Sequence, residues 1–307
     1  MKSKTYEIQN GKELKKCKTS YIFKGLSRNL IPCYPNNRML EKMESYIKEM
    51  LLNNGENVDN ETIQRYINRS SIIGLNLSLQ ERKFIEALSI FIANSTLMNE
   101  IQKNKVFHNR NQDYKISPIS YKNMKFLVSI KDLNKLYGRS ITEKDNEGKC
   151  IVDRLCKKKF FLINHKKQIV YQKAFPMVIK GTQLNFSFHP FLIGRTYDKR
   201  TNFFNDIKTL YEAIFFEYLF MQTKSFRKMQ INHLCFTTRS LLNVLNLKNL
   251  AKTHKQYVIK TLNTCFKKAF EKGIFTEEFE YTKDNFKKDD KNHINIPINP
   301  NFKWDNQ

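Results

Sequence analysis

The sequence predicts an α+β protein that is rich in helix and contains two copies of one arrangement of elements. Helical periodicity recurs along both halves of the chain, and in each half a basic helix is followed by strand-like segments. Hydrophobic residues make up 40% and aromatic residues 13% of the 307 residues, which is enough apolar material for about two domains of roughly 150 residues each. The content of 9 glycines and 7 prolines excludes collagen-like and linker-rich architectures.

The first 74 residues are expected to form a partly helical extension. Apolar residues recur at helical spacing from Arg38 to Leu52, and Asn53-Asn54-Gly55 then supplies a stop signal. A second short helix is expected over Asn60 to Ile67. This segment shows no pattern of catalytic residues.

The first domain is expected to span residues 75–195 and to begin with a capped helix. Ser78-Leu-Gln-Glu81 has the Ser-x-x-Glu spacing of a capping box, which predicts a helix to about Asn94. Phe126 to Ile130 has the composition of a strand, and we expect a short helix after it that ends at Gly138.

A basic helix and a hairpin are expected next in this domain. Glu147 to Lys158 has helical periodicity. Phe160 to Ile163 and Gln168 to Ala174 are predicted to be two strands joined by a basic hairpin tip. Leu184 to Phe188 alternates as a further strand does.

The second domain, residues 203–300, is expected to repeat this order, and residues 301–307 are expected to form a tail. The helices are predicted at Asn205 to Met221, Ser240 to Leu247 and Thr253 to Lys272. The strands are predicted at Glu277 to Thr282 and Ile294 to Ile298.

Helices followed by a two-stranded hairpin are the arrangement of the winged helix, whose third helix can enter the major groove of DNA. The predicted fold class is therefore α+β, with two tandem winged-helix domains. A helix in the groove needs hydrogen-bond donors on its outer face. In the first domain the candidate DNA-binding residues are Lys149, Arg154, Lys157 and Lys158 on the helix, with Lys166 and Lys167 at the hairpin tip. In the second domain they are Lys252, Lys255, Gln256, Lys260, Asn263 and Lys267 on the helix, with Lys283, Lys287 and Lys288 on the wing. Lys268 is also expected to face outward on this helix.

The two candidate surfaces are expected to differ in their role. The side-chain amides of Gln256 and Asn263 can bond adenine bidentately, whereas lysines more often contact phosphates. We therefore expect the second domain to supply most base discrimination and the first domain to grip the DNA backbone. A solvated helix face on a lysine-rich protein is the alternative explanation for both surfaces.

The charge balance favours a polyanionic partner. The 54 Lys and Arg residues against 29 Asp and Glu residues give a net charge of +25. The most apolar segment, Leu210 to Met221, contains Glu212 and Glu217 and is shorter than the roughly 20 residues that a membrane span requires. The start of the chain lacks the apolar stretch of a signal peptide, and the six scattered cysteines are expected to be free thiols, so we expect a cytoplasmic protein.

The sequence lacks the patterns of the DNA-processing enzymes that we considered. It contains no Gly-x-x-x-x-Gly-Lys-Ser/Thr phosphate-binding loop. No two of the six histidines flank an apolar residue, as the metal-holding pair of rolling-circle nicking enzymes does. His254-Lys-Gln-Tyr257 lacks the arginine that a tyrosine recombinase has at this spacing. We expect no catalytic residues, no metal and no cofactor.

Four segments resemble plasmid replication initiators of the Rep type, which have two tandem winged-helix domains. The segments are Leu77 to Phe84, Leu184 to Leu192, Lys208 to Leu219 and Ile294 to Ile298. The resemblance covers about residues 75–300, while residues 1–74 have no counterpart and residues 99–121 form a longer insertion. It implies binding to repeated origin sequences (iterons) in double-stranded DNA, recruitment of the host initiator and helicase, a homodimer, and no covalent chemistry.

Three other functions stay open at this point. A transcriptional regulator would use the same modules, and direct repeats in the DNA beside the gene would favour an initiator over it. A DNA-processing enzyme, such as a recombinase or primase, would need one of the catalytic patterns discussed above. A basic RNA-binding or scaffold protein is the third, although the aromatic strand signature of common RNA-binding modules is missing.

Overall fold

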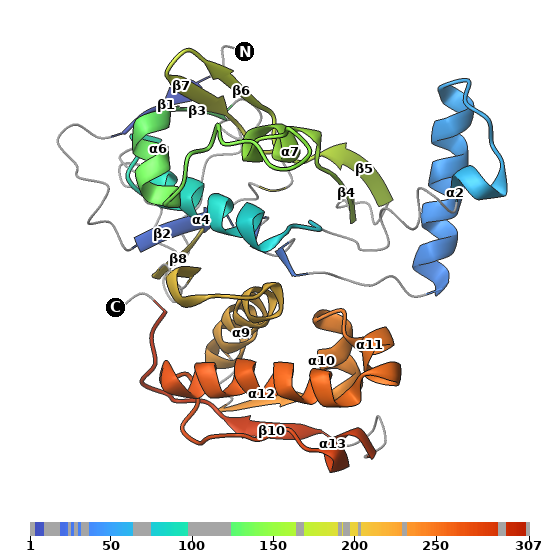
Figure 1. Ribbon diagram of the computed structural model, residues 1–307, viewed down its shortest axis with the longest axis vertical. Helices are drawn as coiled ribbons and strands as arrows, with labels where there is room; N and C mark the ends of the chain where they lie inside the picture. The colour runs from blue at the N-terminus through green and yellow to red at the C-terminus, as the bar shows by residue number, and fades with distance from the viewer. Residues whose placement is uncertain are drawn as a thin grey trace. The chain divides into compact units, whose positions relative to one another are not determined.

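The computed structural model describes an α+β protein, which confirms the predicted class (Figure 1). The described residues are 4–8, 19–23, 26–27, 30–31, 37–63, 75–97, 124–163, 169–189, 192, 197–201, 204–228, 232–287 and 293–304. The chain divides into two compact units. Unit 1 comprises Met1–Leu30, Pro35–Asn205 and Gln307, and unit 2 comprises Ile31–Tyr34 and Asp206–Asn306.

A four-stranded sheet of order β1-β3-β7-β6 lies at the centre of unit 1. Its strands are β1 (Lys4–Tyr6), β3 (Met124–Ser129), β6 (Met177–Lys180) and β7 (Gln183–Phe186). β7 is antiparallel to both of its neighbours, whereas β1 is parallel to β3. β1 therefore draws part of the predicted N-terminal extension into the sheet, and β6 is a strand that the sequence pattern did not predict.

Two helices of unit 1 have termini that the sequence predicts. α4 (Leu79–Ala93) starts with the predicted capping box, because Ser78 Oγ accepts a bond from the backbone N–H of Glu81 at 3.3 Å and the Glu81 carboxylate accepts one from Ser78 N–H at 2.7 Å. α6 (Ile130–Tyr137) ends at Gly138, as predicted. The φ of Gly138 is +78°, a left-handed conformation that glycine adopts without strain.

α7 (Ile151–Lys157) is shorter than the predicted helix, which was expected to begin at Glu147. Asp145 is the physical reason for the later start. Its Oδ1 accepts hydrogen bonds from the backbone N–H groups of Glu147 and Lys149, both at 3.0 Å, and these bonds hold the chain in a turn before α7.

Phenylalanines and a second small sheet complete the main core of unit 1. β2 (Thr19–Phe23) pairs with β8 (Tyr197–Thr201) and packs against α4, where Ser20 Oγ donates to the buried Glu86 carboxylate at 2.7 Å. The rings of Phe126 and Phe186 stack across the central sheet with their centroids 5.1 Å apart. The largely buried strand β2 is thus integral to unit 1.

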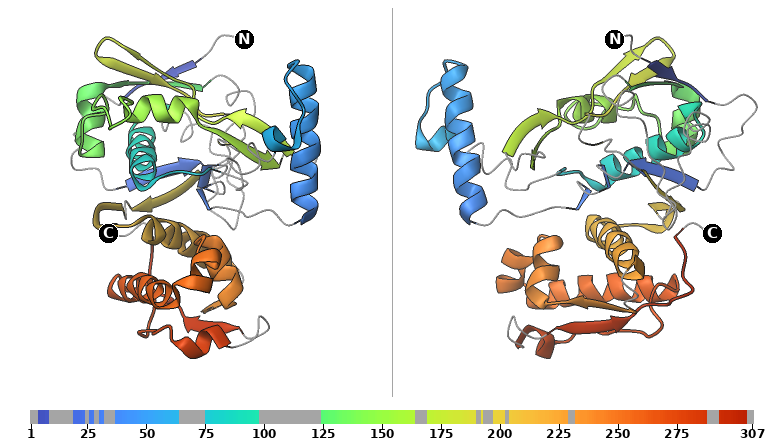
Figure 2. Two further views of the ribbon diagram at one scale, coloured as in Figure 1. Left: turned by 45° about the vertical axis from the view of Figure 1, so that its right-hand side comes forward. Right: turned by 180° about the vertical axis from the view of Figure 1, so that it is seen from behind.

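The predicted hairpin is present, but it belongs to a separate sheet. β4 (Lys159–Ile163) and β5 (Ile169–Lys173) pair only with each other, and α2 (Asn37–Asn53) lies beside them (Figure 2). Met43, Ile47, Leu51, Ile63 and Phe161 form a small core between helix and hairpin. Of the short helix predicted at Asn60 to Ile67, residues 60–63 are described, and they are helical.

Unit 2 contains five α-helices and two strands among its described residues. They are α9 (Leu210–Lys228), β9 (His233–Phe236), α10 (Thr238–Val244), α11 (Lys248–Thr253), α12 (Lys255–Glu271), α13 (Lys283–Lys287) and β10 (Ile294–Pro297). β9 and β10 are antiparallel, and an antiparallel bridge joins Phe275 to Ile298 just beyond β10. The strand predicted at Glu277 to Thr282 is wrong, because the backbone N–H and C=O of Tyr281 bond the side chain of Asn263 instead of a neighbouring strand.

Phe266 of α12 lies at the centre of the core of unit 2. Its ring contacts Phe215 of α9 at 5.1 Å, Phe236 of β9 at 5.8 Å and Phe279 at 5.0 Å between centroids. α12 is therefore held between the first helix and the sheet, and its opposite face is turned to solvent.

Candidate nucleic-acid interface

The two units repeat one order of elements. Unit 1 follows the order α4, β3, α6, α7, β6 and β7, and unit 2 follows the order α9, β9, α10, α12, Phe275 and β10. In both, the last strand lies between the other two, since β7 pairs with β3 and β6, while β10 and the adjoining Ile298 pair with β9 and Phe275. The β4–β5 hairpin is an insertion in unit 1, and α11 is an insertion in unit 2. In unit 1 the hairpin that joins the central sheet is β6–β7, whereas the predicted hairpin β4–β5 forms a separate two-stranded sheet.

A matched ion pair joins α4 to the end of α7 in unit 1 and α9 to α12 in unit 2. Glu81 Oε2 of α4 lies 3.1 Å from Lys158 Nζ, at the end of α7. Glu212 Oε2 of α9 lies 2.7 Å from Lys268 Nζ of α12. Both carboxylates are buried, with 4% of each side chain exposed, and both lie in the first turn of their helix.

The hydrogen bonds around these two pairs also correspond. Lys158 Nζ donates to the carbonyl of Asn76 at 2.7 Å, and Lys268 Nζ donates to the carbonyl of Asp206, so each lysine also reaches the backbone before the first helix. Burial is the largest single influence on Glu212 and would raise its pKa, but the hydrogen bonds from Lys268, Lys208 and Thr209 and the charge of Lys268 together lower the pKa. The matching contacts of Lys158 and Lys268 indicate that α7 is positioned against α4 in the same way as α12 is positioned against α9.

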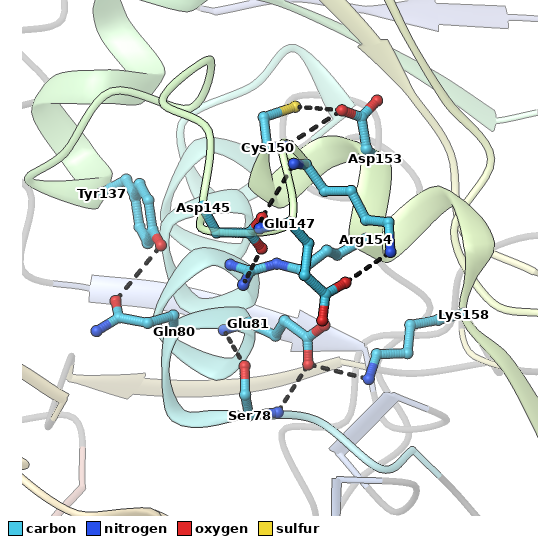
Figure 3. Close-up of polar contacts among 11 residues, drawn as sticks. Ser78, Gln80, Glu81, Tyr137, Asp145, Glu147, Cys150, Asp153, Arg154 and Lys158 are labelled. Carbon is cyan, nitrogen blue, oxygen red and sulfur yellow. Dashed lines mark hydrogen bonds and ion pairs between the residues drawn. The ribbon is translucent and has the colours of Figure 1, made fainter. Parts of the chain in front are cut away.

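The candidate cations around α7 are largely paired with carboxylates of unit 1 (Figure 3). Lys149 Nζ lies 2.6 Å from Glu147 Oε2, and Arg154 Nη1 lies 3.0 Å from Asp145 Oδ2. With Lys158 bound to Glu81, the predicted outward basic face is wrong for Arg154 and Lys158, because their side chains turn toward these acids. Lys157 is exposed, as predicted.

The candidate cations of α11 and α12 have a different environment. Lys252, Lys255, Lys260 and Lys267 are exposed, and none of them forms an ion pair with another residue in the described part of the chain. Gln256 and Thr264 are exposed beside them, and 52% of the Tyr257 side chain is accessible. The structure thus brings together the candidates predicted on this helix, with Asn263 as the exception.

The expected outward orientation is wrong for Lys268, which pairs with Glu212, and also for Asn263. Its Nδ2 donates to the carbonyl of Tyr281 at 3.1 Å, and its Oδ1 accepts from the Tyr281 N–H at 2.7 Å. The Tyr281 hydroxyl in turn donates to Thr238 Oγ1 of α10 at 2.6 Å. Asn263 therefore fastens the segment after Phe275 to α12.

The wing candidates are described only in part. Lys283 is exposed at the first residue of α13. Lys287 ends α13, but its side chain lies outside the described residues, as do Lys166, Lys167 and Lys288 entirely.

One further signal in the sequence bears on the cations of α10 to α12. No Asp or Glu occurs between Glu217 and Glu271, whereas ten Lys and Arg residues do. The run alone does not identify unpaired cations, because Lys268 lies in it and pairs with Glu212. A second acid-free run, residues 154–197, likewise contains the paired Arg154 and Lys158.

No family model, no curated protein and no solved structure matches this chain. Within the described ranges, no group of three or more His, Cys, Asp and Glu residues could hold a metal ion, and no helix is long and apolar enough to cross a membrane. Cys150, Cys156, Cys235 and Cys265 are free thiols, as predicted, while Cys17 and Cys33 lie outside the described residues.

Proposed function

We propose that this chain is a replication initiator that binds double-stranded DNA sequence-specifically through tandem winged-helix domains. The observation that carries the proposal is the exposed face of α12, on which unpaired lysines surround Gln256 in an acid-free segment. The repeated order of elements supports the two domains, because helix, strand, two helices and a hairpin in this order are typical of a winged helix.

The dimensions and chemistry of α12 suit the major groove. Its 17 residues span roughly 25 Å at 1.5 Å per residue, and the groove is about 12 Å wide. Lysine ammonium groups would contact phosphates on both sides, and the Gln256 amide can bond the N6 and N7 positions of adenine. Asn263 is not part of this set.

The resemblance to plasmid replication initiators favours an initiator among the proteins that bind duplex DNA. Two of the resembling segments, Leu77 to Phe84 and Lys208 to Leu219, include the starts of α4 and α9. The other two, Leu184 to Leu192 and Ile294 to Ile298, contain most of β7 and all of β10. Both pairs thus fall at equivalent positions of the repeat. An initiator of this type would bind direct repeats and recruit the host initiator and helicase without covalent chemistry.

Selection from a random duplex library, followed by sequencing, tests the proposal. We expect a defined DNA motif, and a plasmid that carries direct repeats of this motif should replicate only when the chain is expressed. Lys260→Ala with Lys267→Ala should weaken binding, whereas Lys42→Ala with Lys48→Ala on the exposed face of α2 should not. Binding without any sequence preference would contradict the proposed function.

A further inference from the structure

We infer that the two units contribute unequally to DNA binding: α12 of unit 2 grips the phosphates, and α7 of unit 1 does not. This inference rests on the proposed function and assigns the DNA contact to one of its two modules. It departs from the symmetry that the repeated fold suggests, since corresponding helices are given different roles.

A cation contributes to DNA binding when it is free to neutralise a phosphate. A lysine that neutralises a phosphate releases a condensed counterion from the DNA, and this release drives association. A lysine that already has a carboxylate at hydrogen-bond distance must first give up that partner. Lys149 and Arg154 are in this state, at 2.6 and 3.0 Å from Glu147 and Asp145.

Lys158 is held more firmly still. Its partner Glu81 is buried, and the ammonium also donates to the carbonyl of Asn76. A movement of Lys158 to a phosphate would leave a buried carboxylate without its counter-charge, which is strongly unfavourable. The equivalent Lys268 of unit 2 is bound to Glu212 in the same manner, so this pair is common to both units and does not account for the difference between them.

The difference lies in the remaining charges. Between α6 and the end of α7, the exposed acids Glu143, Glu147 and Asp153 lie among the exposed cations Arg139, Lys144 and Lys157 and offset their attraction for a phosphate backbone. The segment from the start of α10 to Lys268 contains no Asp or Glu. Its exposed lysines are Lys252, Lys255, Lys260 and Lys267. The fields of the two third helices therefore differ, although their folds correspond.

The difference between α7 and α12 predicts the length of DNA that the bound chain protects. Winged-helix and related modules that bind as pairs read half-sites about one helical turn, roughly 10 base pairs, apart. With α12 alone in the major groove, the full chain should protect one such turn and not two.

Hydroxyl-radical footprinting and salt titration of the full chain on its selected motif test the inference. We expect one protected turn and a steep slope of log K against log salt. Lys260→Ala with Lys267→Ala should make the slope shallower by about 2, because each lost phosphate contact removes about 0.9. The matched unit 1 variant, Lys149→Ala with Lys157→Ala, should leave the slope unchanged and the affinity within about twofold.

The outcomes separate this inference from the proposed function. Two protected turns, or an equal loss of slope in the unit 1 variant, would overturn the inference while leaving a DNA-binding initiator intact. A wild-type chain that binds no duplex at any salt concentration would overturn both. Circular dichroism spectra of the variants, expected to match the wild type, show that the losses do not come from unfolding.

Discussion

Replacing Lys268 by methionine tests the ion pair that ties α12 to α9. The substitution keeps much of the side-chain volume but removes the ammonium that bonds Glu212 and the carbonyl of Asp206. The side chains of Lys268 and Glu212 are 17% and 4% exposed, so the variant leaves a buried carboxylate without its partner. Breaking a buried pair in this way costs about 3–5 kcal/mol, and we expect the lower end because Lys268 is not fully buried.

The single tryptophan provides a selective assay for unit 2. Trp304 is buried against Phe220 of α9, with ring centroids 5.3 Å apart, and its Nε1 donates to Thr223 at 2.8 Å. Its fluorescence in a urea titration therefore follows the unfolding of this unit. A loss of about 3 kcal/mol lowers the midpoint by about 1–3 M for slopes of about 1–3 kcal/mol per molar urea.

Two further variants isolate the ion pair from other effects. Glu212→Gln combined with Lys268→Met should be less destabilised than Lys268→Met alone, because the uncompensated charge is gone. Lys158→Met, the matched change in unit 1, should leave the tryptophan transition unchanged. An unaltered midpoint in Lys268→Met would refute the reasoning.

The free energy of unfolding of unit 2, followed by tryptophan fluorescence, should fall as the pH is lowered. The pKa of Glu212 is lowered in the folded protein relative to its ordinary value of 4.5. The ionised carboxylate therefore contributes stability that is fully present above the unfolded pKa and is lost as the pH falls through the folded pKa. In Glu212→Gln, the free energy of unfolding should decrease less as the pH is lowered.

Three more predictions follow from the same contacts. Asn263→Ala should lower the free energy of unfolding, measured in urea, by about 1–3 kcal/mol, because it removes two hydrogen bonds to Tyr281. The ratio of cognate to random DNA affinity should stay unchanged in the folded protein. A fall in that ratio without a loss of stability would restore Asn263 as a reader of bases. Cys235, which is exposed, should react with a thiol reagent before Cys265, since burial raises the pKa of the Cys265 thiol; mass spectrometry of the labelled protein decides this. The purified protein should not nick supercoiled plasmid with Mg²⁺ or Mn²⁺, and a covalent protein–DNA adduct on a denaturing gel would contradict the non-enzymatic proposal.

Helix ends that depend on neighbouring residues could be predicted from the sequence, whereas contacts between residues far apart in the chain could not. The capping box at Ser78 and the stop at Gly138 depend on neighbours within a few residues, so the start of α4 and the end of α6 could be predicted. The pairing of Lys158 with Glu81 joins residues far apart in the chain, and no sequence pattern identifies a lysine that will be paired in this way. Asn263 looked exposed for the same reason, since its partner Tyr281 is placed by the fold of the whole unit.

The strands of unit 1 raised a similar difficulty. Both hairpins after α7 have strand composition, and only the pairing of β7 with β3 determines which of them joins the central sheet. The absence of Asp and Glu between Glu217 and Glu271 does not predict which lysines stay unpaired, because Lys268 in this run pairs with Glu212 outside it.

The pairing of β2 with β8 has a consequence for how the protein is made. Thr19 pairs with Thr201 and Phe23 with Tyr197, so β2 leaves the ribosome long before its partner strand exists. At about 5–20 residues per second, that delay is roughly 10–35 s. Ile22 and Phe23, which are buried in the finished fold, must stay unpaired or protected by a chaperone during this interval. Unit 1 thus closes around its own N-terminal strands late in synthesis, when the start of unit 2 is about to emerge.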